Sequence, residues 1–193
     1  IKIDFLTHGC AEADYYYDPE VQTGMQAYNK GMAYLLEQME GMYITMAISP
    51  LFPSQYAHSR RIACDAWAGI GDTEYTLNSL TYGWWLNQVY TYNDPDHLLL
   101  EPVSDGENRA RITSGVITGI FMNGDDLSCI SGIQVAKDKA RKFLTNKDIN
   151  AIAKMGKSFR PVSGNMDGAD FLFMHDTGKE VYLAAFNYSG YDL

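Results

Sequence analysis

Two carboxylates in the first third of the chain have neighbours that suit them to acid–base or nucleophilic chemistry. The first, Asp4, follows Lys2 by two positions, and the period of a β-strand puts both side chains on one face. A nearby ammonium group favours the ionised carboxylate, and a fixed, ionised carboxylate can serve as a nucleophile. An ordinary buried Lys–Asp pair has the same spacing, so the spacing alone leaves both interpretations open.

The second carboxylate, Asp65, follows Arg61 by four residues and precedes Trp67 by two. An aromatic ring beside a carboxyl group favours the protonated acid and suits it to proton donation. A solvated loop aspartate is the alternative interpretation. Two carboxylates on neighbouring strand ends would meet the requirement of retaining glycoside hydrolysis, in which nucleophile and acid/base lie roughly 5 to 5.5 Å apart.

A third group of polar residues is the segment Asn93-Asp94-Pro95-Asp96. Its two carboxylates could bind a cation through oxygen ligands, which would suit a cation-dependent transferase or hydrolase. A rigid turn explains the same residues equally well. The three cysteines and four histidines share no spacing typical of a metal site, and the sequence therefore predicts neither a metal nor an organic cofactor.

The elements that would position these groups repeat in the order apolar strand, acidic loop, amphipathic helix. We expect strands near residues 1, 43, 61, 89 and 120. We expect helices over about 18–39, 72–88, 105–118 and 147–155, the first with Asp18 as its N-cap and Pro19 as its first residue. Sequential strand–helix units imply parallel strands joined by right-handed crossovers, and no glycine-rich phosphate fingerprint follows any strand.

These units predict an α/β chain that is part of a (β/α)8 TIM barrel. A complete barrel has eight strands and takes roughly 250 residues, whereas this chain has 193. We expect residues 1–155 to be the C-terminal part of the barrel, about five units, and 156–193 to begin an all-β sandwich with a hairpin around 176–179. In such barrels reactive groups lie at the strand C-termini. The acidic residues at the expected ends are Asp4, Asp65, Asp94, Asp96, Asp125 and Asp126.

Partners follow from the unfinished barrel and from the charge. Five strands without their three partners leave unpaired sheet edges, so we expect a missing N-terminal segment, in the same gene product or a separate chain, to complete the fold. With 24 acidic and 15 basic residues the net charge is −9, which disfavours nucleic acid and anionic membranes as partners. No apolar run approaches the roughly 20 residues that span a bilayer.

The ordered motifs resemble the catalytic barrel of the alpha-galactosidases of glycoside hydrolase family 27, which has relatives in family 36. The segment Lys2-Ile3-Asp4 resembles the family's K-x-D strand, and residues 61–65 resemble its R-x-x-x-D segment. Residues 93–98 are similar to the end of its W-N-D-P-D-M-L stretch, with Tyr92 in place of tryptophan. Residues 117–127 resemble its final strand, and the resemblance covers about residues 1–155.

The resemblance implies a retaining exo-glycosidase that releases terminal α-D-galactosyl residues from oligo- or polysaccharides without a cofactor. It makes Asp4 the nucleophile that attacks the anomeric carbon. It makes Asp65 the acid that protonates the leaving oxygen and the base that then deprotonates water. An extracytoplasmic location, secreted or periplasmic, is expected from this class of enzyme. The substrate-binding candidates are Lys2, Arg61, Trp67 and Asp94.

One position departs from the family and widens the range of expected substrates. The family places glutamate, or serine in N-acetylgalactosaminidases, two residues before the proline after the fifth strand, where it meets the substituent on sugar carbon 2. Here that residue is Ile48, before Ser49-Pro50. The alternatives are therefore an α-N-acetylgalactosaminidase, a β-L-arabinopyranosidase or a non-catalytic carbohydrate-binding barrel.

Overall fold

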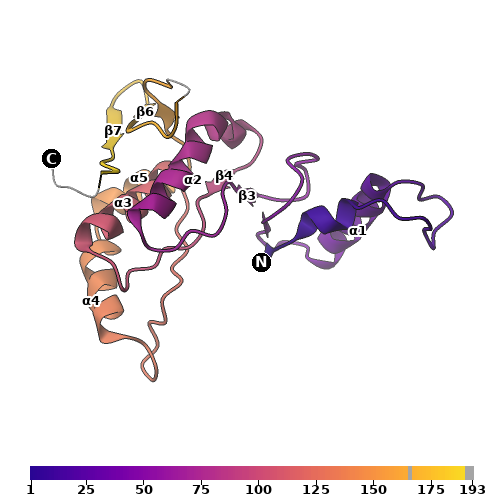
Figure 1. Cartoon of the computed structure of the whole chain (residues 1–193), viewed down its shortest axis with the longest axis horizontal. Coiled ribbons are helices and arrows are strands. Elements are labelled where there is room, and N and C mark those ends of the chain that lie inside the picture. The colour runs from indigo at the N-terminus through magenta and orange to yellow at the C-terminus, as the bar shows by residue number, and fades with distance from the viewer. Residues whose placement is uncertain (165–166, 190–193) are drawn as a thin grey trace. The chain divides into compact units, whose positions relative to one another are not determined.

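The computed structural model describes residues 1–164 and 167–189 and divides into two compact units, Ile1–Arg61 and Ile62–Leu193 (Figure 1). The chain is mixed α/β, with parallel strands and a separate antiparallel sheet. Among the described residues, no helix is long and apolar enough to cross a membrane.

The first unit is built on parallel strands. They are β1 (Lys2–Ile3), β2 (Thr45–Met46) and β3 (Ser59–Arg61), paired in that order. A short 3-10 helix, η1 (Leu6–Cys10), follows β1, and α1 (Gly24–Gln38) leads to β2.

Helix α1 contacts one face of these strands through Tyr28. The hydroxyl of Tyr28 on α1 donates a hydrogen bond to the Met46 sulfur at 3.5 Å, and both side chains are buried. Met46 aligns with Ile3 across the strand pair, whereas Lys2, Thr45 and Ser59 are aligned in the neighbouring row. Since alternate residues of a strand point to opposite faces, this second row lies on the face opposite α1.

The start of α1 differs from the predicted one. Thr23 is the N-cap, because its hydroxyl accepts the Gln26 N–H at 3.2 Å while the Gln26 amide oxygen accepts the Thr23 N–H at 3.1 Å. The predicted N-cap, Asp18, is wrong: it accepts the Glu20 N–H in a turn and pairs with Lys30. A reciprocal capping box satisfies two helix N–H groups, which Asp18 alone does not.

The second unit contains the other helices. The predicted helix 105–118 is confirmed, and the helix predicted over 72–88 is an α-helix followed by a 3-10 turn. The helix at 134–143 was not predicted. The elements are α2 (Ile70–Gly83), η2 (Trp84–Gln88), α3 (Asp105–Thr118), α4 (Gln134–Phe143) and α5 (Lys147–Lys154).

The strand content of this unit also differs from the prediction. The strand expected at 89–92 is instead β4 (Tyr92–Asp94), whose last carbonyl accepts the Ile62 N–H at 2.9 Å. No strand forms over 120–122, where only an isolated parallel bridge joins Leu98 to Asn123 among the described residues. Two hydrogen bonds made by the Leu98 backbone hold this bridge, one to Met122 at 2.6 Å and one from Gly124 at 2.8 Å.

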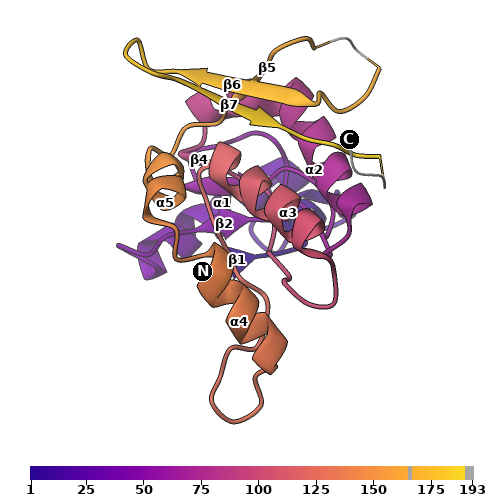
Figure 2. The same cartoon turned by 90° about the vertical axis from the view of Figure 1, so that its left-hand side faces the viewer.

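The predicted hairpin at the end of the chain is confirmed. It belongs to an antiparallel sheet in the order β5 (Arg160–Pro161), β6 (Leu172–Asp176) and β7 (Val181–Ala185). Figure 2 shows β6 and β7 over α2 and α3, and Leu77, Leu80 and Ile117 from the helices share a core with Phe173. Within the predicted domain 156–193, residues 165–166 and 190–193 lie outside the described residues.

Candidate functional site

The ends of β1, β2 and β4 share an uncommon backbone feature. Two residues after each strand a non-glycine residue has a positive φ: 57° at Phe5, 41° at Ile48 and 71° at Asp96. In the described part of the chain these are the positive-φ residues other than glycine. Such conformations cost about 1 to 3 kcal/mol each and cluster at functional sites. We therefore take the strand ends as the candidate site region.

Lys2 and Asp4 are both exposed at the end of β1. The alternative of a buried Lys–Asp pair is therefore wrong. The Asp4 carboxylate accepts the N–H of the next residue, Phe5, at 2.8 Å, so its position is set by the local backbone. Lys2 lies on the face opposite α1, and the strand period assigns Asp4 to the same side.

Arg61 ends β3 on this same face. It follows Ser59 by two residues, and the Ser59 hydroxyl lies 2.7 Å from that of Thr45 on the neighbouring strand. All three of these side chains are buried, in contrast to Lys2 and Asp4. The first unit thus gathers Lys2, Asp4 and Arg61 on one side of its parallel strands.

Ile48 is held in its left-handed conformation by the loop that follows β1. Its carbonyl oxygen accepts hydrogen bonds from both the Thr7 backbone N–H, at 2.7 Å, and the Thr7 hydroxyl. Its side chain is 41% exposed. A β-branched residue at positive φ is an outlier, and the double hydrogen bond explains how this strain is maintained.

In the second unit, Asp94 and Asp96 build a turn. The Asp94 carboxylate accepts the Asp96 N–H at 2.8 Å, and the Asp96 carboxylate accepts the Ala66 N–H at 2.9 Å. Asp94 is 0% and Asp96 1% exposed. The geometry thus favours the turn over a cation site, and no group of three or more His, Cys, Asp or Glu within 1–164 and 167–189 could hold a metal ion.

This turn fixes the loop that carries Asp65. Ala66 is buried and lies between two exposed residues, Asp65 and Trp67, so the Asp96 carboxylate anchors the backbone directly between them. The Trp67 ring meets His97 edge to face, with the ring centroids 5.9 Å apart, and remains 59% exposed. The second unit therefore presents a carboxyl group and an aromatic surface from one anchored loop.

Arg111 is a residue that sequence reasoning missed. It extends from α3, is 1% exposed, and donates hydrogen bonds to the carbonyl oxygens of Pro95 and His97, the latter at 3.0 Å. Burial lowers the pKa of its guanidinium to about 10, and attraction from Asp96, Asp72 and Asp94 offsets part of this effect. Its helical spacing from Asn108 and Gly115, which are also buried, was the available signal.

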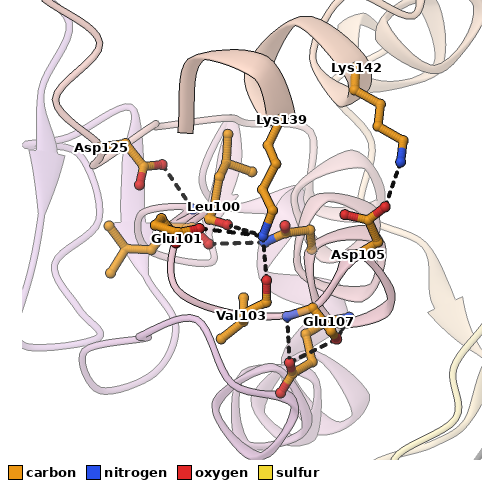
Figure 3. Close-up of polar contacts among 11 residues, drawn as sticks. Leu100, Glu101, Val103, Asp105, Glu107, Asp125, Lys139 and Lys142 are labelled. Atoms are coloured by element: carbon orange, nitrogen blue, oxygen red, sulfur yellow. Dashed lines mark hydrogen bonds and ion pairs between the residues drawn. The ribbon is translucent and has the colours of Figure 1, made fainter. Parts of the chain in front are cut away.

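The last two acidic strand-end residues also support the backbone. Asp125 accepts the Leu100 N–H at 2.8 Å, and Lys139 of α4 donates to the Leu100 carbonyl, also at 2.8 Å, and to that of Val103 (Figure 3). Asp126 is exposed, and hydrogen bonds from the Ser131 hydroxyl and the Ser128 N–H lower its pKa to about 2. The contacts of Asp125 and Lys139 fix the segment that leads from the Asp96 turn to α3, whereas those of Asp126 are local to its own loop.

The structure thus defines a mixed α/β protein with charged and aromatic groups at the carboxyl ends of its parallel strands. No protein-family model matches the chain, and no curated protein matches it. The case for a function therefore depends on the residues and their geometry.

Proposed function

We propose that the chain is the C-terminal part of the (β/α)8 catalytic barrel of a retaining exo-glycoside hydrolase that removes terminal α-D-galactosyl residues. The observation that carries this proposal is the anchored loop of the second unit. Asp65 and Trp67 are exposed on either side of Ala66, whose N–H is held at 2.9 Å by the buried Asp96 carboxylate. A fixed carboxyl group beside an aromatic surface suits a sugar acid/base.

The reaction proceeds in two displacements. Asp4 attacks the anomeric carbon while Asp65 gives its proton to the leaving oxygen, so the glycosidic bond breaks and a glycosyl ester with Asp4 forms. Asp65, now ionised, takes a proton from water, which attacks the anomeric carbon and releases Asp4. Lys2 and Arg61 bind sugar hydroxyls and stabilise the charge on Asp4, and the carboxyls need a separation of roughly 5 to 5.5 Å.

The remaining barrel strands come, in this proposal, from an N-terminal segment in the same gene product or in a separate chain. β1 is the terminal strand of the order β1-β2-β3, and the outer edge of such a strand offers backbone groups to another strand. Without that segment the sugar site is incomplete. The 193-residue chain alone is therefore expected to be inactive.

Ile48 supports a second assignment of the sugar. Its 41% exposed side chain is apolar and cannot hydrogen-bond a hydroxyl on sugar carbon 2. The methyl group of an N-acetyl substituent can pack on such a surface, and a β-L-arabinopyranoside shares the ring stereochemistry of galactose. A panel of aryl α-galactosides, α-N-acetylgalactosaminides and β-L-arabinopyranosides therefore separates the candidate substrates.

The proposal is tested by assaying the whole polypeptide, meaning this chain together with the N-terminal segment that completes the barrel, with an aryl α-galactoside and following the first product by NMR. We expect the released galactose to appear first as its α-anomer, and Asp4→Ala to abolish release. Asp138→Asn is the matched control, because Asp138 is an exposed α4 residue paired with Arg141, and its activity should equal that of the wild type. A β-anomer as the first product, or full activity in Asp4→Ala, would contradict the mechanism.

A further inference from the structure

A buried cation, Arg111, holds the turn of Asp94 and Asp96 that anchors the loop of Asp65. The Arg111 guanidinium donates to the carbonyl oxygens of Pro95 and His97, the residues on either side of Asp96. It also lies 3.4 Å from the hydroxyl oxygens of Thr76 and Ser114. One side chain from α3 therefore holds the backbone before and after a single aspartate.

Asp96 passes this constraint to the exposed loop. Its backbone is left-handed, with a φ of 71°, and its N–H is held by Asp94, so the direction of its side chain is fixed by the turn. Its carboxylate then accepts the Ala66 N–H, thirty residues away in the sequence. The path from Arg111 to Ala66 runs through its hydrogen bonds to the Pro95 and His97 carbonyls, along the backbone to the buried Asp96, and through the hydrogen bond of Asp96 to Ala66.

Lysine cannot replace Arg111 in this arrangement. Guanidinium nitrogens are spread in a planar fork, which lets Nη2 and Nε reach His97 while Nη2 also reaches Pro95. An ammonium group carries three donors on one nitrogen, so it cannot reach all four oxygens that surround the guanidinium, those of Pro95 and His97 and the hydroxyls of Thr76 and Ser114. The Asp96 turn would then be held less firmly than by arginine.

We propose that Arg111 is a positioning residue that acts through Asp96 and Ala66 to hold Asp65 where it donates its proton. This inference rests on the proposed role of Asp65 as the acid/base. Arg111 itself does not touch the sugar. Its loss should therefore affect proton donation selectively and leave nucleophilic attack by Asp4 largely intact.

The first arm of the test needs no substrate. Backbone hydrogen exchange at Ala66 is measured by NMR in the full chain for the wild type, Arg111→Lys and Arg109→Lys. We expect exchange at Ala66 to rise by about tenfold in Arg111→Lys, because the buried hydrogen bond opens more often. Arg109 is the matched control, since it lies on the same helix but stacks on Phe143, and its variant should exchange like the wild type.

The second arm measures the dependence on the leaving group in the whole polypeptide. For Arg111→Lys we expect kcat/KM to fall about 100-fold with a phenyl galactoside, which needs the acid, and less than about fivefold with a dinitrophenyl galactoside, which does not. An Asp96→Ala variant, which removes the acceptor of the Ala66 N–H, should show the same selectivity if Arg111→Lys fails to fold.

The outcomes separate the two proposals. Equal losses of kcat/KM with the phenyl and the dinitrophenyl galactoside in Arg111→Lys would overturn the positioning role of Arg111. Unchanged hydrogen exchange at Ala66 in that variant would do the same, and either result would leave the glycosidase proposal intact. A wild-type whole polypeptide, with the N-terminal segment that completes the barrel, that hydrolyses no glycoside would instead remove the proposed function. The role of Arg111 in positioning the acid would then be removed as well. The hydrogen-exchange measurement would still show whether Arg111 stabilises the hydrogen bond at Ala66.

Discussion

The loops that carry the two proposed catalytic carboxylates are supported in opposite ways. Asp4 lies directly at the end of β1 and accepts the N–H of its own neighbour, so local sequence sets its position. The loop of Asp65 is held instead by Asp96, thirty residues later, and Asp96 is flanked by the contacts of Arg111 from α3. The local backbone alone thus positions Asp4, whereas the loop of Asp65 depends on a buried scaffold that is distant in the sequence.

The left-handed residues show the same contrast. Phe5 and Ile48 are hydrophobic, have no side-chain hydrogen bond to offer, and are 58% and 41% exposed. Asp96 has the same backbone conformation, but its buried carboxylate makes the contact that anchors Ala66. In the first unit, therefore, the side chains at the strained positions make no hydrogen bond, whereas in the second unit the side chain at the strained position makes one.

The largest effects should come from the carboxylates themselves. Asp4→Ala should lower kcat of the whole polypeptide by about 10⁴-fold or more, as loss of a covalent nucleophile does in other hydrolases. Added azide should restore turnover in Asp4→Ala and also in Asp65→Ala, because this small anion can attack the sugar when a catalytic carboxylate is absent. The product distinguishes them, since azide attacks the sugar directly in Asp4→Ala and gives the inverted glycosyl azide.

In Asp65→Ala the glycosyl ester on Asp4 still forms with a good leaving group, and azide then gives the retained glycosyl azide. NMR of the two products checks the assignment. Azides of the same configuration from both variants would show that the roles of the two carboxylates are not as proposed.

The next largest effect should be a difference in stability between variants of the two regions. Asp96→Ala leaves the buried Ala66 N–H without its acceptor and should lower the free energy of unfolding by about 1 to 3 kcal/mol. Asp4→Ala removes an exposed group and should change it by less than about 0.5 kcal/mol. Urea denaturation of the two variants and the wild type measures both values, and equal losses would abolish the contrast between the regions.

Glycine substitutions at the left-handed positions sharpen the comparison. Ile48→Gly relieves the strain of a β-branched residue at a φ of 41° and should raise the free energy of unfolding by about 1 kcal/mol. Asp96→Gly relieves the same kind of strain but removes the anchoring carboxylate, and it should be destabilising. Calorimetry of the pair checks the opposite signs, and a loss of stability in both would mean that the Ile48 side chain contributes more than its conformation costs.

Several features of the fold could be predicted because their signals are local. The bounds of α3 follow from its capping box, in which Ser104 and Glu107 satisfy each other's N–H groups within four residues. The hairpin of β6 and β7 follows from two apolar runs with a turn between them. At α1 a similar local signal, Asp18-Pro19, was outweighed by the box of Thr23 and Gln26.

The scaffold of the candidate site could not be predicted, since it depends on contacts between residues far apart in sequence. Asp65 and Asp94 could be singled out by type and spacing, but nothing near Ala66 in the sequence indicates that Asp96 holds its N–H. The strand predicted at 120–122 is likewise absent, and an isolated parallel bridge between Leu98 and Asn123 stands in its place. This bridge also depends on a partner that is distant in the sequence. Parallel pairing is settled by distant partners rather than by the run of apolar residues.

The smallest expected effect is a dependence of stability on pH in the second unit. Burial of Asp170 raises its pKa, but N–H groups of Gly164, Leu172 and Ser163 donate to its carboxylate and together lower the pKa below the ordinary value. The stabilisation is therefore fully present above pH about 4 and is lost as the pH falls through the lowered pKa. Urea denaturation of Asp170→Asn should show a weaker decline of the free energy of unfolding as the pH falls below about 4.

The exposed Asp138 provides the control for this measurement, and Asp138→Asn should decline with acid as the wild type does. A decline of the free energy of unfolding in Asp170→Asn equal to that of the wild type would show that other carboxylates cause the loss of stability in acid.

The central claim, that Asp4 is the covalent nucleophile, is tested most directly by trapping the glycosyl-enzyme. The whole polypeptide is incubated with a fluorinated galactoside that has a good leaving group, which forms the ester quickly and hydrolyses it slowly, and its peptides are then mapped by mass spectrometry. We expect the sugar on the peptide that contains Asp4 and no adduct in Asp4→Ala. An adduct on a different carboxylate, or an active enzyme that is never labelled, would contradict the claim.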